Sequence, residues 1–155
     1  MIAAYEAEDR SALLQAPRQY GLGQTHKHLP EMAAICGLEH APVFCPVVAP
    51  YYAGMEVTVP LTPADTSASV DEIKEAYKAY YQSGLIRFAD APDEDGFISA
   101  GAFAGRDDLE VSVYGNDERI LLVSRFDNLG KGASGAAIQN MNIALGFNEA
   151  EGLVI

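Results

Sequence analysis

The stretch spanning residues 109–128 constrains the fold most, because it holds two runs in which apolar and polar residues alternate. Such alternation is typical of β-strands that bury one face. Between the runs, Gly115-Asn116-Asp117 predicts a tight turn, so the two runs are expected to pair as an antiparallel hairpin. A lone hairpin is marginally stable in water, so further strands or helices must pack on it.

Three helices are expected around this hairpin, over residues 25–37, 69–84 and 131–146. The middle one has the clearest boundaries, since Ser69 and Glu72 have the spacing of a capping box and Gly84 is a typical stop. Thr25 is the expected cap of the first helix, and Gly37 is its expected end. The last helix follows the hairpin directly.

Two runs rich in β-branched and aromatic residues predict strands at 43–48 and 55–61, and two further strands are expected at 18–23 and 85–90. Pro46 and Pro60 lack a backbone N–H, which restricts their strands to edges, ends or bulges. Strands that neighbour each other in sequence favour antiparallel pairing with helices packed on one face. The predicted class is therefore α+β, with one domain over residues 1–155.

The amino-acid composition excludes several classes of binding partner and cellular location. The chain carries 22 acidic against 10 basic residues, a net charge of −12, which argues against nucleic acid or an anionic membrane as the main partner. No apolar run approaches the roughly 18 residues of a membrane span, and the N-terminus does not have the pattern of a signal peptide. Two cysteines do not form a disulfide framework, so a reduced, cytoplasmic protein is expected.

The first candidate site is the segment His26-Lys27-His28-Leu29-Pro30-Glu31. Two imidazoles, an ammonium and a carboxylate within six residues suit proton transfer near neutral pH on an anionic substrate. The alternative is a solvated loop that leads into a capped helix. His26, His28 and Glu31 have metal-ligand spacing, but nothing else in the chain clusters with them, so no metal site is expected.

The second candidate is residues 126–137, in which an Asp127-Asn128 turn leads into Gly130-Lys131-Gly132 at a helix start. Glycines allow close approach of a ligand, and a helix start favours anions. The alternative is tight packing of small residues. The segment is not a P-loop, since Arg125 and Gly132 occupy positions where that motif needs Gly and Ser or Thr.

Taken in order, HKHLPEM at 26–32 and LLVSRFDNLGKGASGAAIQNMNIALGF at 121–147 resemble the C-terminal half of the N-acetyl-gamma-glutamyl-phosphate reductase family. The resemblance implies a substrate and dimerisation domain similar to that of glyceraldehyde-3-phosphate dehydrogenase, α+β with a mixed, largely antiparallel sheet. In that family a dinucleotide-binding domain, with the nucleophilic cysteine, comes first. The opening residues look like the end of a helix, so the chain is expected to be an inactive fragment of a longer protein.

By the same resemblance, the reaction is the reduction of N-acetyl-glutamyl-5-phosphate to N-acetyl-glutamate 5-semialdehyde with NADPH, in arginine biosynthesis. His26 matches the catalytic acid–base, and His28 and Glu31 match positions that hold substrate. Asn128 matches an asparagine that contacts the nicotinamide amide in the wider dehydrogenase family. Lys131 and Gly132 open the helix that returns toward the cofactor domain, so all three are expected to lie at the NADP site. The implied partners are the acyl-phosphate substrate, the chain's own N-terminal dinucleotide-binding domain and a further copy of the subunit.

One departure and two alternatives accompany the resemblance. Some family members carry a basic residue in the turn that here contains Tyr52 and Ala53, so Arg18 or Arg125 would have to replace its contact with the substrate anion. The first alternative is a free-standing binding or assembly module. The second is another enzyme on the same fold, such as aspartate-semialdehyde dehydrogenase, whose helix start is similar.

Overall fold

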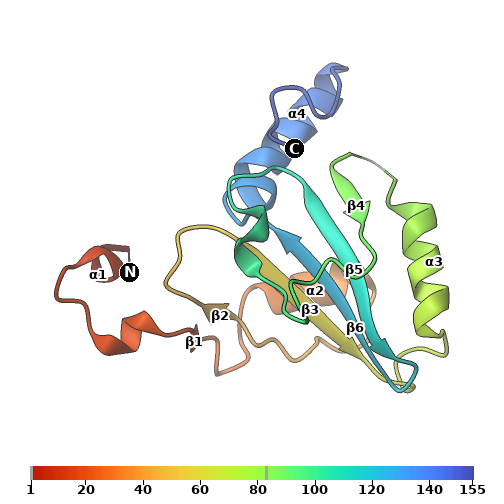
Figure 1. The fold of residues 1–155 in the computed structure, drawn as a ribbon, viewed down its shortest axis with the longest axis horizontal. Coiled ribbons are helices and arrows are strands. Elements are labelled where there is room, and N and C mark those ends of the chain that lie inside the picture. The colour runs from red at the N-terminus through yellow and green to blue at the C-terminus, as the bar shows by residue number, and fades with distance from the viewer. Residues whose placement is uncertain (1, 83) are drawn as a thin grey trace. The chain divides into compact units, whose positions relative to one another are not determined.

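The computed structural model describes residues 2–82 and 84–155, and it divides into two compact units, Met1–Tyr52 and Ala53–Ile155 (Figure 1). Within those described ranges, none of the helices is both long and apolar enough to span a membrane.

The first unit has little regular structure. Its elements are α1 (Ile2–Glu6), the 3₁₀ turn η1 (Ala12–Gln15), β1 (Arg18–Gln19), α2 (His28–Cys36) and β2 (Val47–Val48). β1 and β2 pair antiparallel, but each has two residues where the sequence predicted six. Gly21 ends β1, because its φ of +66° lies outside the extended region, and Pro46 cannot donate to the ladder ahead of β2.

The second unit is built on a four-stranded sheet. In the order β3-β6-β5-β4, the strands are Met55–Leu61, Arg119–Phe126, Leu109–Asn116 and Ile86–Phe88. β3 and β5 are antiparallel to β6, whereas β4 is parallel to β5. The predicted α+β class with a mixed, largely antiparallel sheet is confirmed, and Pro60 lies in an edge strand as its missing N–H requires.

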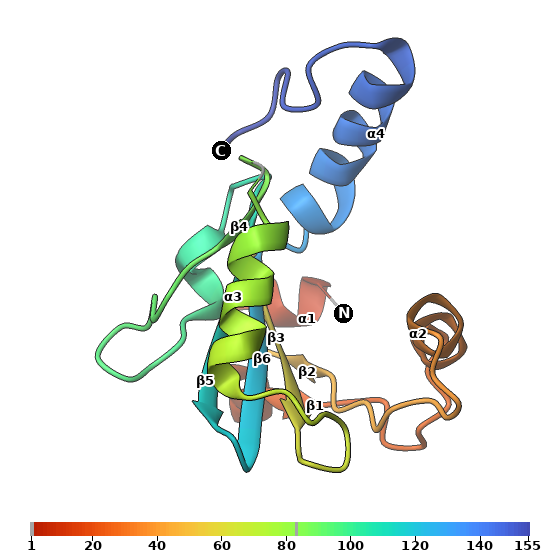
Figure 2. The same ribbon diagram turned by 90° about the vertical axis from the view of Figure 1, so that its right-hand side faces the viewer.

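One face of this sheet is covered by α3 (Val70–Tyr80), which runs alongside β5 (Figure 2). The capping box of Ser69 and Glu72 is present, and the Asp117 carboxylate accepts a further bond from the Val70 N–H at 3.0 Å. Tyr77 packs edge-on against Phe88 of β4, with 6.5 Å between ring centroids. The predicted stop at Gly84 was wrong, since the C-cap is Tyr81.

The hairpin forms as predicted, but its turn was placed wrongly. The last cross-strand pair is Asn116 with Arg119, so the turn consists of Asp117 and Glu118. The Asn116 side-chain oxygen accepts the N–H groups of both Glu118 and Arg119, which stabilises this tighter turn. The resulting register sets Glu110 of β5 opposite Arg125 of β6.

The other face of the sheet carries a buried charge network. Glu110 lies between Arg125 and Arg87 of the two flanking strands, and Arg125 is 4% exposed. Arg125 also binds Glu94 at 2.6 Å and the Pro92 carbonyl at 3.0 Å, which fastens the segment after β4 across this face. That segment ends in a second 3₁₀ turn, η2 (Ala100–Phe103).

The C-terminal helix differs from the prediction at its start. It opens with a π-helical turn, η3 (Gly130–Ser134), before α4 (Gly135–Leu145). Backbone bonds between residues five apart produce this turn, from Gly132 to Asp127 and from Ser134 to Leu129. The helix ends where its predicted range does, at Gly146, which has a left-handed backbone as the C-cap.

Candidate functional site

In the first unit, His26 lies at the entrance to α2 with a defined ring orientation. Its Nδ1 accepts the backbone N–H of His28 at 3.3 Å. A neutral imidazole that accepts at Nδ1 carries its proton on Nε2. The ring packs against Phe44 at 5.2 Å and Tyr20 at 6.0 Å between centroids. His26 is thus half-buried and presents an N–H donor.

The loop that carries His26 is held by Gln24, a residue for which the sequence predicted no role. Its side-chain amide bonds both the N–H and the carbonyl of Phe44, at 2.9 and 2.7 Å. Gln24 itself has a left-handed backbone, with φ +51°. Because the partner lies twenty positions away and is a backbone group, no motif spacing could have revealed it. Gln24 fixes Phe44, and Phe44 packs on His26.

The remaining residues of this motif lie at the start of α2, and one of them contacts His26. The His28 ring lies 4.7 Å from that of His26, and Glu31 lies one turn along α2. Lys27, His28 and Glu31 are all exposed. The predicted cap at Thr25 was wrong: Lys27 is the N-cap residue and makes no side-chain cap bond. Within the described part of the chain, His, Cys, Asp and Glu side chains form no group of three that could hold a metal.

In the second unit, Asp127 organises the turn between β6 and η3. Its carboxylate, 2% exposed, accepts N–H groups from Gly105, Leu129 and Gly130. Burial alone raises the pKa of Asp127, but these three backbone donors outweigh it, and the pKa lies below the ordinary value. Asp127 therefore stays charged and holds the turn.

Asn128 follows Asp127 directly, and its side-chain oxygen already accepts a hydrogen bond within the protein. Its Oδ1 accepts the N–H of Gly54 at 2.9 Å. Gly54 fits there because it has no side chain: its φ is +114°, and a Cβ would meet the Ala100 carbonyl oxygen at 2.3 Å. The Asn128 oxygen is thus an internal contact, and its amide N–H₂ group is the donor that remains for a ligand.

Lys131 and Gly132 lie on the π turn. The Lys131 ammonium donates to the side-chain oxygen of Gln139 at 2.6 Å and is half-buried. Gly132 donates its N–H to the Asp127 carbonyl, and a Cβ at this position would lie 3.3 Å from the Phe126 ring. Nearby, Gly135 packs so tightly on Asp107 that a Cβ would lie 2.3 Å from the carboxylate. Tight packing thus explains Gly135, whereas Lys131 remains available to an anion.

The structure distinguishes the two arginines considered for a substrate anion. Arg125 is buried in the charge network and bonded to Glu110, Glu94 and Pro92, so it is unsuited to that role. Arg18 donates to the Tyr5 hydroxyl at 2.7 Å. The sequence could not predict which of the two arginines is buried, because that depends on cross-strand pairing.

A family of known proteins matches the residues that form this fold and the His26 motif. The family model described as "Semialdehyde dehydrogenase, dimerisation domain" matches residues 3–128. The chain belongs to this family. The matched residues include the His26 motif and the whole four-stranded sheet, and the match ends at Asn128, before α4.

Curated relatives carry a more specific name. N-acetyl-gamma-glutamyl-phosphate reductase 2 of Nostoc sp. is 44% identical over 144 residues, covering 86% of this chain and 45% of the relative. The N-acetyl-gamma-glutamyl-phosphate reductase of Burkholderia ambifaria is 40% identical over 157 residues, covering 96% of this chain and 50% of the relative. The chain therefore spans about half the length of the curated relatives it matches.

Among solved structures, aspartate semialdehyde dehydrogenase II from Vibrio cholerae is similar with a TM-score of 0.60. The match covers 89% of this chain and 43% of that one, at 17% identity. At this identity the likeness supports the fold alone.

Proposed function

We propose that the chain is the substrate-binding and acid–base half of a cytoplasmic, homo-oligomeric N-acetyl-gamma-glutamyl-phosphate reductase, which works together with a dinucleotide-binding domain. The observation that carries the proposal is the identity of 37–44% to proteins of that name over 86–96% of this chain. The reaction consumes an acyl phosphate, NADPH and a proton, and it yields the semialdehyde, NADP and phosphate.

His26 supplies the proton in this proposal. When a carbonyl carbon accepts a hydride, negative charge develops on its oxygen, and a positioned acid lowers the barrier. His26 suits this role because its Nδ1 is occupied by the His28 N–H, which leaves Nε2–H as the donor. His28 and Glu31, exposed beside it, provide a donor and an acceptor that hold the substrate.

The turn in the second unit fits NADP. A bound NADPH supplies the hydride, which none of this chain's side chains can provide. Asn128 offers amide N–H donors to a carboxamide oxygen, because its own oxygen is bonded to Gly54. Lys131 offers a cation to a phosphate, and Gly132 keeps the turn free of a side chain beside it.

The test uses the complete gene product from its native start. NADPH formation is followed with N-acetyl-glutamate 5-semialdehyde, phosphate and NADP. We expect His26→Ala to lower kcat about 10²- to 10⁴-fold, the usual contribution of a general acid–base. His40→Ala is the matched control, since His40 is exposed and its only ion pair among the described residues is a 4.0 Å contact with Glu39. Equal rates in parent and His26→Ala would exclude the acid–base role.

The fold likeness to an aspartate semialdehyde dehydrogenase supports a second substrate for comparison. The same assay with aspartate semialdehyde separates the two. A kcat/KM that favours the N-acetylated substrate supports the proposal, whereas a preference for aspartate semialdehyde overturns it. A complete protein with no activity on either substrate would favour the binding-module alternative.

A further inference from the structure

Lys131 is part of a chain of hydrogen bonds that continues away from the proposed cofactor turn. Its ammonium has three donors, of which one reaches the Gln139 Oε1 at 2.6 Å. Gln139 lies on α4, two turns beyond Lys131. The acceptor is a neutral amide, so the bond fixes the ammonium in place without neutralising its charge. Two donors and a full positive charge remain.

Glu149 determines which way the Gln139 amide faces. The Gln139 Nε2 donates to the Glu149 Oε2 at 3.0 Å. An ionised carboxylate only accepts hydrogen bonds, so it selects the N–H₂ end of the amide and turns the oxygen toward Lys131. Without Glu149, the amide would be free to present its own N–H₂ group to the ammonium, which is a repulsive contact.

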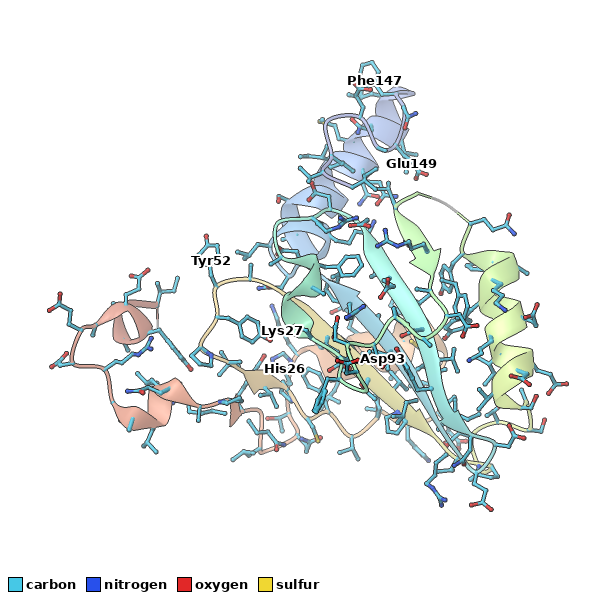
Figure 3. The ribbon with its side chains drawn as sticks, in the orientation of Figure 1. His26, Lys27, Tyr52, Asp93, Phe147 and Glu149 are labelled. Carbon is cyan, nitrogen blue, oxygen red and sulfur yellow. The ribbon has the colours of Figure 1, made fainter. Side chains whose placement is uncertain are left out.

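Glu149 is in turn fixed by the helix. Asn142, 3% exposed on α4, donates to the backbone carbonyls of Glu149 and Glu151 at 3.2 and 2.9 Å. These bonds hold the turn after α4 against the helix, and Figure 3 labels Glu149 on this turn. The order of support therefore runs from Asn142 to Glu149, Gln139 and Lys131.

We propose that Gln139 and Glu149 are positioning residues that present the Lys131 ammonium, still fully charged, to a phosphate group during the reductase reaction. The inference rests on the proposed role of Lys131. A direct Lys131–Glu149 ion pair would hold the lysine equally well, but it would cancel the charge that an anion needs. The interposed glutamine separates the two charges and keeps the lysine oriented.

The phosphate has two sources in the reaction, the dinucleotide and inorganic phosphate, and the experiment separates them. In the complete enzyme, KM is measured for NADP at saturating phosphate and for phosphate at saturating NADP, together with the Kd of NADPH by fluorescence titration. For Gln139→Leu we expect one of these constants to rise about tenfold, the effect of one charge-assisted hydrogen bond, while kcat changes less than KM.

A charge swap distinguishes positioning from stability. The double variant Gln139→Glu/Glu149→Gln keeps two hydrogen-bonding partners along the chain, but it moves the carboxylate next to Lys131. A merely structural role would be rescued by the swap. In our proposal thermal stability returns toward that of the parent, while the KM or Kd stays about tenfold raised because the ammonium is now neutralised.

Each outcome is decisive. A rise confined to the NADP constants assigns the phosphate to the cofactor, and a rise confined to the phosphate KM assigns it to the co-substrate. Parent-like constants in both Gln139→Leu and the swap overturn the inference. Failure of the parent to act on N-acetyl-glutamate semialdehyde would overturn the proposed function instead, and the NADPH titration still tests the positioning role there.

Discussion

The His26 loop and the Asp127 turn are fixed in different ways. Among the described residues of the first unit, only Leu29 and Pro46 are buried, and His26 is oriented through a glutamine that bonds the backbone. The Asp127 turn rests on a core with buried apolar and charged side chains. The comparison indicates that the proposed proton donor, His26, depends on a few exposed hydrogen bonds, whereas the proposed cofactor turn depends on the stability of the sheet.

The buried carboxylates on and beside the sheet are compensated by arginine side chains. Glu110 is 6% exposed and Asp108 fully buried, and each is bonded to arginine. Burial raises the pKa of Asp108, but Arg106 and Arg87 outweigh that effect and bring it below the ordinary value. The three guanidinium groups of Arg87, Arg106 and Arg125 also lie 5.1–5.7 Å from the centre of the Phe103 ring.

The largest effect is expected from breaking this network. Arg125→Met removes the guanidinium that pairs with buried Glu110 at 2.7 Å and leaves it only the longer 3.8 Å contact with Arg87. Breaking a buried ion pair costs about 3–5 kcal/mol of unfolding free energy. Urea unfolding measures it. Arg119→Met is the matched control on the same strand, because its pair with Glu118 is exposed and worth less than about 1 kcal/mol. Similar losses in both variants would show that the network contributes nothing beyond surface pairing.

A smaller effect is expected at Asp127, and it depends on pH. A carboxylate whose folded pKa is lowered stabilises the fold above its unfolded pKa, and this stability is lost as the pH falls through the folded pKa. Asp127→Asn should cost about 2 kcal/mol at pH 7, since its amide would confront the Gly105 N–H. The gap to the parent should narrow in acid, when the parent's own carboxylate is protonated.

The control for this titration is Asp9→Asn, an exposed substitution in the first unit. It should leave the unfolding free energy and its pH dependence unchanged. A gap between parent and Asp127→Asn that stays constant from pH 7 to acid would contradict the role given to the Asp127 charge.

Local signals in the sequence were sufficient for part of this fold. Three predictions that depend on neighbouring residues are confirmed: the capping box at Ser69, the helix stop at Gly37 and the strand Met55–Leu61. The hairpin was found, but its register was not. A turn over Gly115-Asn116-Asp117 sets Glu110 opposite Leu122, which hides its pairing with Arg125.

The candidate site was predictable to a similar degree. His26 and Lys131 stand out because their residue types carry chemistry in a recognisable motif. The residues that support them do not stand out in the sequence. Gln24 bonds a backbone group, and Gln139 reaches Lys131 only because η3 and α4 bring the two together. Cys36 beside Ile35 and Cys45 beside Phe44 are predicted from these apolar neighbours to be buried, but both are exposed. Burial depends on contacts between distant segments, which a single sequence does not specify.

The smallest effect is expected at Gln24, and it is the sharpest test of the contrast between the two regions. Gln24→Leu removes both bonds to Phe44 and frees the ring that packs on His26. In the complete enzyme we expect kcat to fall about tenfold, the equivalent of about 1.4 kcal/mol. Thermal stability should barely change, because the bonds are exposed.

Gln24→Glu should fall between parent and Gln24→Leu, because a carboxylate still accepts the Phe44 N–H but no longer donates to its carbonyl. Gln15→Leu is the matched control, as an exposed glutamine of the same unit with no side-chain bond among the described residues. A Gln24→Leu enzyme that unfolds as early as Arg125→Met would mean that the His26 loop contributes to stability as the charge network does. One that keeps both its stability and its kcat would mean that His26 is oriented by its bond to the His28 N–H alone.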